Sequence, residues 1–350
     1  MHDNSFGTIL GGDADRLQAS RQVFTSMPVD WDLMADAPPE MPLVQRTIAR
    51  PVAVTGPGTF LGKATRTLNF EPTEKEGWWF NRTDLPNTLP VRVSVRNVWN
   101  TGQIVSNIVL RSGSPQNYVR LAEHIICLRL GTRIHNLMIN TESGDPPLLP
   151  RYARDILEAL DEAGIRETNR SVRYVTVKEK VSLVGPRGDF LMVSPFEGKD
   201  PVLALDCAVD FPTAIGRQRI QFPVNDKNIR LGSEARTNTT LFKMMYCKTV
   251  GNFFADIRNL GYNFENVLIA GRFGYINKPK LMYGDKSLEA VWHRAVLDLL
   301  AALALIDDGY FIGQVESFKA GHRLDVDLVR KLYQKNLIVP VTFPAVSSSP

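Results

Sequence analysis

The chain has 350 residues, of which 44% are hydrophobic and 22% charged, proportions typical of a soluble globular protein with room for two domains. Its formal net charge of +4 is spread along the sequence without a block of lysines and arginines, so we expect no nucleic-acid partner. No apolar run is long enough to span a bilayer, no secretory signal opens the chain, and the three cysteines form no CxxC pair, so we expect a cytoplasmic protein with reduced thiols.

Residues 1–42 are interpreted as an N-terminal extension that ends in a proline-rich run at 37–42. We expect this extension to be partly ordered, with one short helix near residues 15–25. Its residues suggest no particular chemistry.

Residues 43–166 are predicted to form a first α+β domain of strands, a helix, a strand and a helix. A glycine-rich turn at 56–62 joins the first two strands, and Gly164 would end the last helix at its C′ position. The polar segment 166–170 is interpreted as a linker. The expected strands are 47–55, 63–70, 91–98, 104–110 and 134–140, and the expected helices are 117–130 and 152–163.

Residues 171–345 repeat this order and are predicted to form a second α+β domain. The fold is therefore expected to be α+β, with two similar domains, each a sheet with a helix pair, packed so that the helices lie between the two sheets. The expected strands are 172–183, 190–195, 202–210, 219–223, 266–270 and 309–318, and the expected helices are part of 241–260, 288–306 and 325–334.

The predicted helix 288–306 is almost wholly apolar, yet His293, Arg294 and Asp298 interrupt it. Buried charge is costly unless it is paired or bound to a metal. On its own, the segment fits an ordinary core helix with a hydrogen-bonded histidine. A functional site is favoured by two further features: Glu123-His124 in a second apolar helix, and His322 a short distance after the first. Such a site would lie at the seam between the two halves.

Several segments, taken in order from about Val44 to Val339, resemble motifs of one known family, the zinc-dependent UDP-3-O-acyl-N-acetylglucosamine deacetylases of lipid A biosynthesis. Each motif alone is weak, but their order and spacing together support the family fold. The segments are GPGTFLG at 56–62, GWWFNRTDLP at 77–86, Glu123-His124, ILEALDEAGI at 156–165, SEARTN at 233–238, LGYNFENVLI at 260–269 and FKAGH at 318–322.

The resemblance implies a zinc-dependent hydrolase. A zinc ion would be held by His124, His293 and Asp298, which is the catalytic pattern of three protein ligands and an open position for water. Zinc lowers the pKa of a bound water toward ~7, so a nearby carboxylate can complete its deprotonation. Glu123 would be that general base, and His322 would act as the general acid or stabilise the oxyanion.

The resemblance also implies a substrate, a UDP-linked 3-O-acyl-N-acetylglucosamine that loses its N-acetyl group. Thr237 would support the reacting carbonyl, and Arg294 and Lys319 are candidates for contact with the substrate. We further expect a monomer that makes peripheral contact with membrane lipid.

The spacing of His293 and Asp298 departs from the family pattern. The family's two ligands are four residues apart on one helical face, whereas these are five apart and would diverge on a regular α-helix. Two alignments remain open. A match without gaps puts Arg294 at the ligand position, where a guanidinium cannot bind zinc. An inserted residue would instead require a π-bulge, which brings residues i and i+5 onto one face.

Three further positions differ from the family. Ala302 replaces a carboxylate that orients the general acid, Phe60 replaces a histidine, and residues 150–153 replace a short polar turn. The loss of an orienting partner typically costs about 10–100-fold in activity. A second hypothesis is therefore a catalytically inactive or repurposed relative that binds a similar glycolipid or a protein partner.

Overall fold

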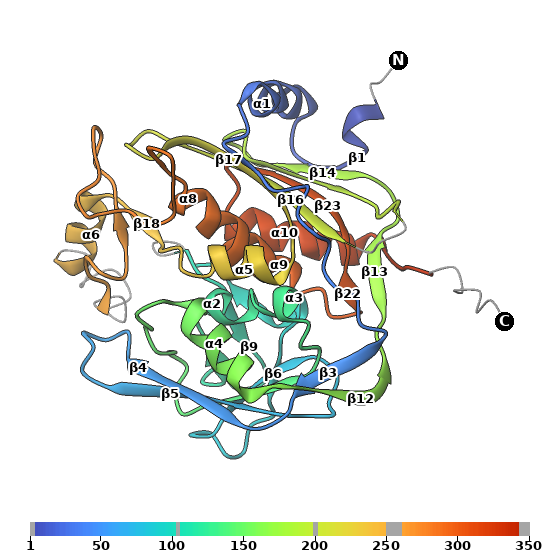
Figure 1. Cartoon of the computed structure of the whole chain (residues 1–350), viewed down its shortest axis with the longest axis vertical. Coiled ribbons are helices and arrows are strands. Elements are labelled where there is room, and N and C mark those ends of the chain that lie inside the picture. Colours follow the sequence, from blue (N-terminus) through green and yellow to red (C-terminus); the bar gives the residue numbers. More distant parts are fainter. Residues whose placement is uncertain (1–3, 103–105, 199–201, 250–260, 343–350) are drawn as a thin grey trace.

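The computed structural model of the chain describes residues 4–102, 106–198, 202–249 and 261–342. Two main sheets face each other, and a layer of helices fills the space between them (Figure 1). This arrangement confirms the predicted α+β fold with its helices between the sheets. In these residues, no helix is both long and apolar enough to cross a bilayer.

The first half is built on a five-stranded sheet in the order β4-β5-β11-β6-β7. Its strands alternate in the period of two that a half-buried sheet requires. Phe70 and Ile139 pair across β5 and β11 and point into the core, whereas their neighbours Asn69 and Asn140 pair on the outer face. The strands are β4 (Val52–Pro57), β5 (Thr65–Glu71), β11 (Leu137–Thr141), β6 (Trp78–Arg82) and β7 (Val91–Arg92).

Helices cover the inner face of this sheet, and three of the smaller elements form a separate three-stranded sheet in the order β10-β9-β8. Gly164 ends the longest of these helices with a positive φ of 68°, as the sequence predicts. The helices are α2 (Glu123–Ile126), α3 (Arg129–Thr132) and α4 (Ala153–Ala163), and the smaller elements are η2 (Val95–Asn97), β8 (Val98–Asn100), β9 (Val109–Arg111) and β10 (Tyr118–Val119).

The second half is built on a seven-stranded sheet in the order β1-β14-β15-β23-β16-β17-β2. Its central strands are buried on both faces: in β15, Leu191 and Val193 pack into the main core, while Phe190 and Met192 face the opposite side. The strands are β1 (Thr8–Gly11), β14 (Val181–Val184), β15 (Phe190–Ser194), β23 (Gly313–Phe318), β16 (Leu203–Phe211), β17 (Gly216–Pro223) and β2 (Trp31–Asp32).

The inner face of the seven-stranded sheet carries the helices that face the first half (Figure 1). The predicted helix 288–306 is present as three consecutive segments, and the predicted helix 325–334 begins earlier, at His322. These helices are α5 (Asp226–Gly232), α8 (Glu289–Trp292), the π-helix η4 (His293–Leu299), α9 (Leu300–Leu303) and α10 (His322–Gln334).

The N-terminal extension is more ordered than we expected, because it completes the seven-stranded sheet. After the short turn η1 (Asn4–Phe6), its strands β1 and β2 form the two edges. Between them, α1 (Ala14–Ser26) confirms the predicted short helix. It places Leu17 and Phe24 against the outer face of the sheet in a separate apolar cluster.

Other segments differ from the sequence-based prediction. The expected linker 166–170 lies inside strand β12 (Ile165–Ser171), which pairs with β3 (Val44–Ile48). Its side chains are mostly exposed, so backbone pairing rather than burial makes it a strand. The expected helix 117–130 is broken into α2 and α3 with β10 before them. A small sheet joins β22 (Tyr310–Phe311), β13 (Tyr174–Val177) and β24 (Ile338–Pro340).

A small lobe is formed by residues 238–248 and 261–283. Of the expected partly helical segment 241–260, the first part is helix α6, and residues 250–260 lie outside the described residues. The elements of this region are β18 (Asn238–Thr239), α6 (Leu241–Lys248), β19 (Leu268–Ile269) and β20 (Met282–Tyr283), followed by β21 (Lys286–Ser287).

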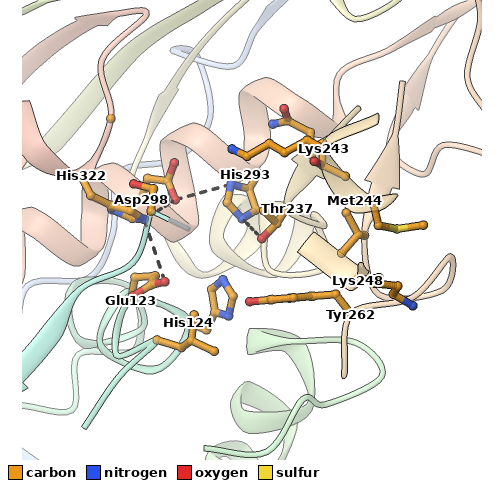
Figure 2. A pocket seen from close by; sticks show the side chains of 16 residues that line it. Glu123, His124, Thr237, Lys243, Met244, Lys248, Tyr262, His293, Asp298 and His322 are labelled. Atoms are coloured by element: carbon orange, nitrogen blue, oxygen red, sulfur yellow. Dashed lines mark hydrogen bonds and ion pairs between the residues drawn. The ribbon is translucent and has the colours of Figure 1, made fainter. Parts of the chain in front are cut away.

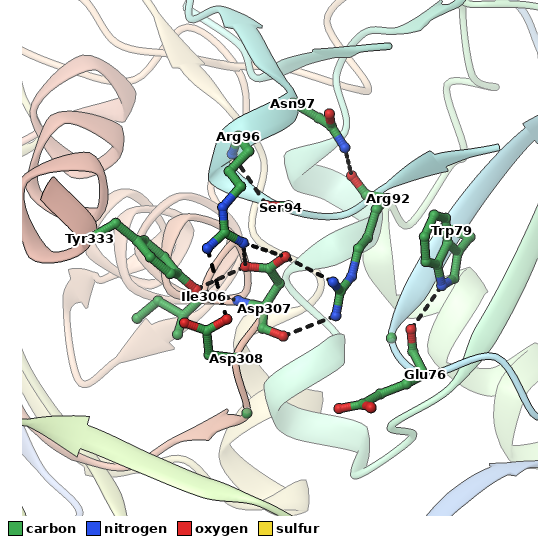
Figure 3. A network of polar contacts seen from close by, with 12 residues as sticks. Glu76, Trp79, Arg92, Ser94, Arg96, Asn97, Ile306, Asp307, Asp308 and Tyr333 are labelled. Carbon is green, nitrogen blue, oxygen red and sulfur yellow. Dashed lines mark hydrogen bonds and ion pairs between the residues drawn. The ribbon is translucent and has the colours of Figure 1, made fainter. Parts of the chain in front are cut away.

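Asp307, a buried residue after α9, joins the two halves (Figure 3). Its carboxylate accepts hydrogen bonds from Nη1 of Arg96 and from the Tyr333 hydroxyl, both at 2.8 Å. Nη1 of Arg92 lies 3.2 Å from its second oxygen. Both arginines belong to the first half. Because separating the halves would leave this buried carboxylate without its cations, the network fixes their relative position.

Gly232, at the end of α5, allows this helix to pack closely against the central helix. A methyl group added there would lie 2.8 Å from Cε3 of Trp292 and closer still to Val296. We expect Gly232→Ala to lower the free energy of unfolding by about 1–3 kcal/mol, the usual cost of overpacking. Urea denaturation measures this. Gly274→Ala is the control, because its methyl group would meet no atom within 4 Å; equal stabilities of the two variants would contradict the packing argument.

Candidate active site

A cavity of about 260 Å³ lies where the two halves meet. Side chains from α2, from the segment before β18, from the π-helix and from the start of α10 line it (Figure 2). Six of the residues expected from the sequence are among them: Glu123, His124, Thr237, His293, Asp298 and His322. The structure therefore brings together segments that are far apart in the chain.

His293 and Asp298 lie on one face of the central helix because this segment is a π-helix. The backbone N–H of Leu300 bonds to the carbonyl of Ala295, five residues earlier. As a result, Nδ1 of His293 lies 3.5 Å from Oδ1 of Asp298. This confirms the predicted π-bulge over the alignment without gaps. Such bulges are often found at functional sites.

Arg294 is buried in the second half and does not line the cavity, although its Nη1 lies 3.9 Å from Oδ2 of Asp298. Its Nη1 donates to Oδ2 of Asp325 at 2.7 Å, and its Nη2 donates to Oδ1 of Asp325 at 2.5 Å and to Ser317 Oγ at 3.1 Å. Arg294, which we expected to contact the substrate, is absent from the cavity lining, and both ends of its guanidinium bond to buried partners. The pairing is bidentate and fixes α10 against the π-helix.

Asp298 lies between two imidazoles. Its Oδ1 is 3.3 Å from Nε2 of His322 as well as 3.5 Å from Nδ1 of His293. Burial by itself would raise the pKa of this carboxyl group, but His322, His293 and Arg294 together lower it well below its usual range. Oδ1 is nevertheless buried without a hydrogen bond of good geometry from any described residue. It is therefore an acceptor that lacks a donor or a cation.

Glu123 is fully enclosed at the N-terminal end of α2. Its Oε2 accepts the backbone N–H of Ile108 at 2.7 Å, and its Oε1 lies 4.0 Å from Nε2 of His322. Burial raises the pKa of Glu123 to about 8, although the Ile108 N–H opposes the shift. A carboxyl group with a pKa in this range can accept and return a proton near neutral pH.

His124 follows Glu123 and packs between two rings. Its ring centroid is 5.5 Å from that of Tyr152 and 6.0 Å from that of His293. Burial, reinforced by His293, lowers the pKa of His124 to about 3. The imidazole is therefore neutral, which is the form that ligates metals.

Thr237 and His322 complete the site from the second half. The Thr237 hydroxyl is 3.0 Å from Nε2 of His293, and this contact orients the imidazole (Figure 2). Burial lowers the pKa of His322, while Asp298 opposes that shift. Nδ1 of His322 is buried without a hydrogen-bond partner among the described residues. The family carboxylate that Ala302 replaces would orient this same side chain.

Two other expected positions lie away from the cavity. Lys319 is exposed, with its ammonium 5.6 Å from the ring of Phe318, and it does not line the cavity. Phe60 lies at the exposed turn between β4 and β5, outside the cavity lining. The structure thus separates these two residues from the reacting groups.

The donor set suits zinc in its chemistry, but the described side chains do not form a finished site. Neutral His124, together with His293 and the ionised Asp298, supplies the nitrogen and oxygen ligands that zinc accepts. The Oδ1 of Asp298, buried without a good donor, fits a missing cation. Among the described residues, however, no group of three His, Cys, Asp or Glu side chains is arranged to hold a metal ion.

Several site residues were not anticipated from the sequence. Asp325 gave no signal, because a buried ion pair between two helices has no local pattern. Lys243, Met244 and Tyr262 line the far end of the cavity, opposite Asp298 and His322 (Figure 2). The sequence shows that these residues are basic or apolar. It does not show that they line the cavity, because this depends on how the small lobe folds.

Comparisons with known proteins agree with this geometry. The sequence model of the family described as "UDP-3-O-acyl N-acetylglycosamine deacetylase" (LpxC) matches residues 45–334. A UDP-3-O-acyl-N-acetylglucosamine deacetylase from Pseudoalteromonas translucida is 27% identical over 319 residues, which cover 86% of this chain and 96% of that protein. The protein of the same name from Bdellovibrio bacteriovorus is 29% identical over 293 residues, or 83% and 90% of the two chains. That from Marinobacter nauticus is 27% identical over 319 residues, or 87% and 95%.

The ion pair between Arg294 and Asp325 makes a clear prediction about stability. Asp325→Asn would leave a buried guanidinium without its counter-charge, so we expect the free energy of unfolding to fall by about 3–5 kcal/mol. Asp226→Asn is the matched control: Asp226 pairs with Nε of Arg230 at 2.8 Å on the surface, where such pairs contribute about 1 kcal/mol or less. Denaturant unfolding of both variants measures the difference, and a loss at Asp325 no larger than that at Asp226 would refute the buried pair's role.

Proposed function

The chain belongs to the UDP-3-O-acyl N-acetylglycosamine deacetylase family, and from this premise we propose that it is a zinc-dependent amidohydrolase that removes the N-acetyl group from a UDP-linked 3-O-acyl-N-acetylglucosamine. The observation that carries the proposal is the π-helix, which puts His293 and Asp298 side by side in the cavity that Glu123 and His124 also line. Such π-bulges are frequent at functional sites.

His124, His293 and Asp298 would hold the zinc ion. Three observations support this assignment: the lowered pKa of His124, the lowered pKa of Asp298, and the lack of a good donor at Oδ1 of Asp298. Thr237 holds the His293 ring through its other nitrogen, a supporting contact of the kind that orients metal ligands. A bound zinc ion would supply Lewis acidity that lowers the pKa of water toward ~7.

Glu123 and His322 would divide the proton transfers of amide hydrolysis. Glu123 accepts a proton from the water that attacks the acetyl carbonyl carbon. His322, 4.0 Å away, donates a proton to the nitrogen of the amino sugar as the carbon–nitrogen bond breaks. The products are acetate and a free amine.

The two ends of the cavity suit the two parts of an acylated sugar. The reacting groups occupy one end, and Met244 and Val267 contribute apolar surface at the other. Lys243 lies close to that apolar end and could approach an anionic part of the substrate. The N-acetyl amide of the substrate would lie at the end with the reacting groups, and its acyl chain would lie at the apolar end.

A catalytically inactive or repurposed relative that binds a similar glycolipid or a protein is the second candidate. Two observations favour it: the described residues hold no finished metal site, and Nδ1 of His322 is buried without a hydrogen-bond partner among them. Metal content and turnover distinguish the two candidates.

We expect purified, metal-replete protein to contain about one zinc ion per chain, because a three-ligand site binds one ion. His293→Ala and Asp298→Ala should each abolish this zinc, as measured by mass spectrometry of the metal. His135→Ala is the control, because His135 is also buried but lies outside the cavity, where it accepts the N–H of Arg46 at 3.0 Å. Absence of zinc from the wild-type protein would favour the inactive relative.

Glu123→Gln should separate chemistry from metal binding. The amide keeps the size of the side chain but cannot accept the proton of water, so we expect turnover to fall by about 10²–10⁴-fold while zinc content is retained. Release of acetate from the acylated UDP-sugar is the measurement. If this variant retains wild-type turnover, Glu123 is not the general base.

A further inference from the structure

The small lobe of residues 238–248 and 261–283 is rich in large apolar side chains that are exposed. Among the described residues, nine of the sixteen large apolar side chains that are exposed belong to it. Phe242 is 82% exposed and Phe273 is 91% exposed. Isolated exposed apolar residues are normal, but such a concentration marks an interaction surface. Its main members are Leu241, Phe242, Met245, Phe264, Phe273 and Ile276.

The lobe cannot bury these side chains in a core of its own. It has a separate apolar cluster of only three buried residues: Met244, Val267 and Ile269. β18 and β19 pair in parallel, and the N–H of Ile276 donates to the carbonyl of Ile269 at 2.8 Å. In the described residues, backbone pairing orders the lobe around this small cluster, and its exposed aromatic side chains belong to no core cluster.

The charges of the lobe are strongly one-sided. Its described residues include a single acidic side chain, Glu265. A protein interface is poor in lysine, whereas lysine stems lie well along a bilayer surface with the ammonium among the headgroups. Basic and aromatic residues together suit an anionic lipid surface. The basic residues are Lys243, Lys248, Arg272, Lys278 and Lys280.

The same lobe also forms the far end of the candidate active site. In α6, Met244 faces the cavity, while Phe242 and Met245 are exposed on the outside. Tyr262 also lines the cavity (Figure 2). Figure 1 shows α6 at one edge of the molecule. The outer surface and the cavity therefore lie on opposite sides of a single short helix.

We propose that this lobe docks the protein on the surface of a bilayer that contains anionic phospholipid. Phe242 and Phe273 insert among the headgroups, and the lysines attract the negative surface. Docking of this kind would bring the cavity close to the membrane, where an acylated substrate would concentrate. The advantage of access to an acylated substrate rests on the proposed function, whereas the membrane contact itself does not.

Vesicle sedimentation with the full chain tests the proposal in the absence of substrate. Vesicles of phosphatidylglycerol and phosphatidylethanolamine should bind the protein, and vesicles of phosphatidylcholine alone should bind it weakly. Phe242→Ser combined with Phe273→Ser should lower the partition coefficient about ten-fold or more, because two exposed aromatic anchors are lost. Added salt should weaken binding, because the lysines contribute through charge.

The matched control is Leu89→Ser combined with Trp99→Ser, which removes two apolar side chains that are 82% and 56% exposed in the first half. This variant should bind vesicles as the wild type does. Equal losses in the two double variants, or no binding of anionic vesicles by the wild type, would overturn the proposal. Self-association that depends on Phe242 and Phe273, without vesicle binding, would also overturn it, in favour of a second copy of the chain.

Zinc content of both double variants, measured alongside, keeps this test separate from the proposed function. We expect it to match the wild type, because neither pair of residues lies in the cavity. A protein that binds anionic vesicles but holds no zinc would refute the hydrolase and leave the docking surface standing.

Discussion

The i to i+5 geometry of the π-helix determines where each charged group in the centre of the molecule lies. One turn of backbone sends His293 and Asp298 to the cavity lining, whereas Arg294, 3.9 Å from Asp298, lies behind that lining and reaches Asp325. There the guanidinium needs a buried counter-charge, which Asp325 of α10 supplies. Since α10 begins at His322, the same ion pair that neutralises Arg294 also holds His322 beside Asp298.

The position of the first-half residues depends on contacts of a different kind. Glu123 and His124 reach the cavity from a helix of only four residues, which could not hold them by itself. The carboxylate of Asp307 and the backbone of Ile306, which accepts a hydrogen bond from Arg129 at 2.8 Å, fix the first half against the second. The site is therefore shaped by two buried polar networks, one within the second half and one between the halves.

Much of this organisation could be predicted from the sequence, because it follows from local pattern. The apolar period of residues 288–306 predicted a buried helix. The five-residue spacing of its histidine and aspartate, compared with four in the resembling family, made a π-bulge one of two open alignments. Contacts between distant segments could not be predicted: neither Asp325 as the partner of Arg294 nor the lobe around Tyr262 has a local signature. The strand at 165–171 was missed because its side chains are polar and only its backbone pairing with β3 defines it.

The N-terminal extension has a consequence for solubility. Open sheets expose unpaired backbone groups along their outermost strands, which can recruit other chains. Here the outermost positions are taken by β1, four residues long, and β2, two residues long, and α1 shields the apolar face between them. Strands this short offer few backbone groups with which a strand of another chain could pair. Removal of residues 4–42 would bare β14 and β17 together with Phe190 and Met192, and would turn a shielded sheet into a surface prone to aggregation.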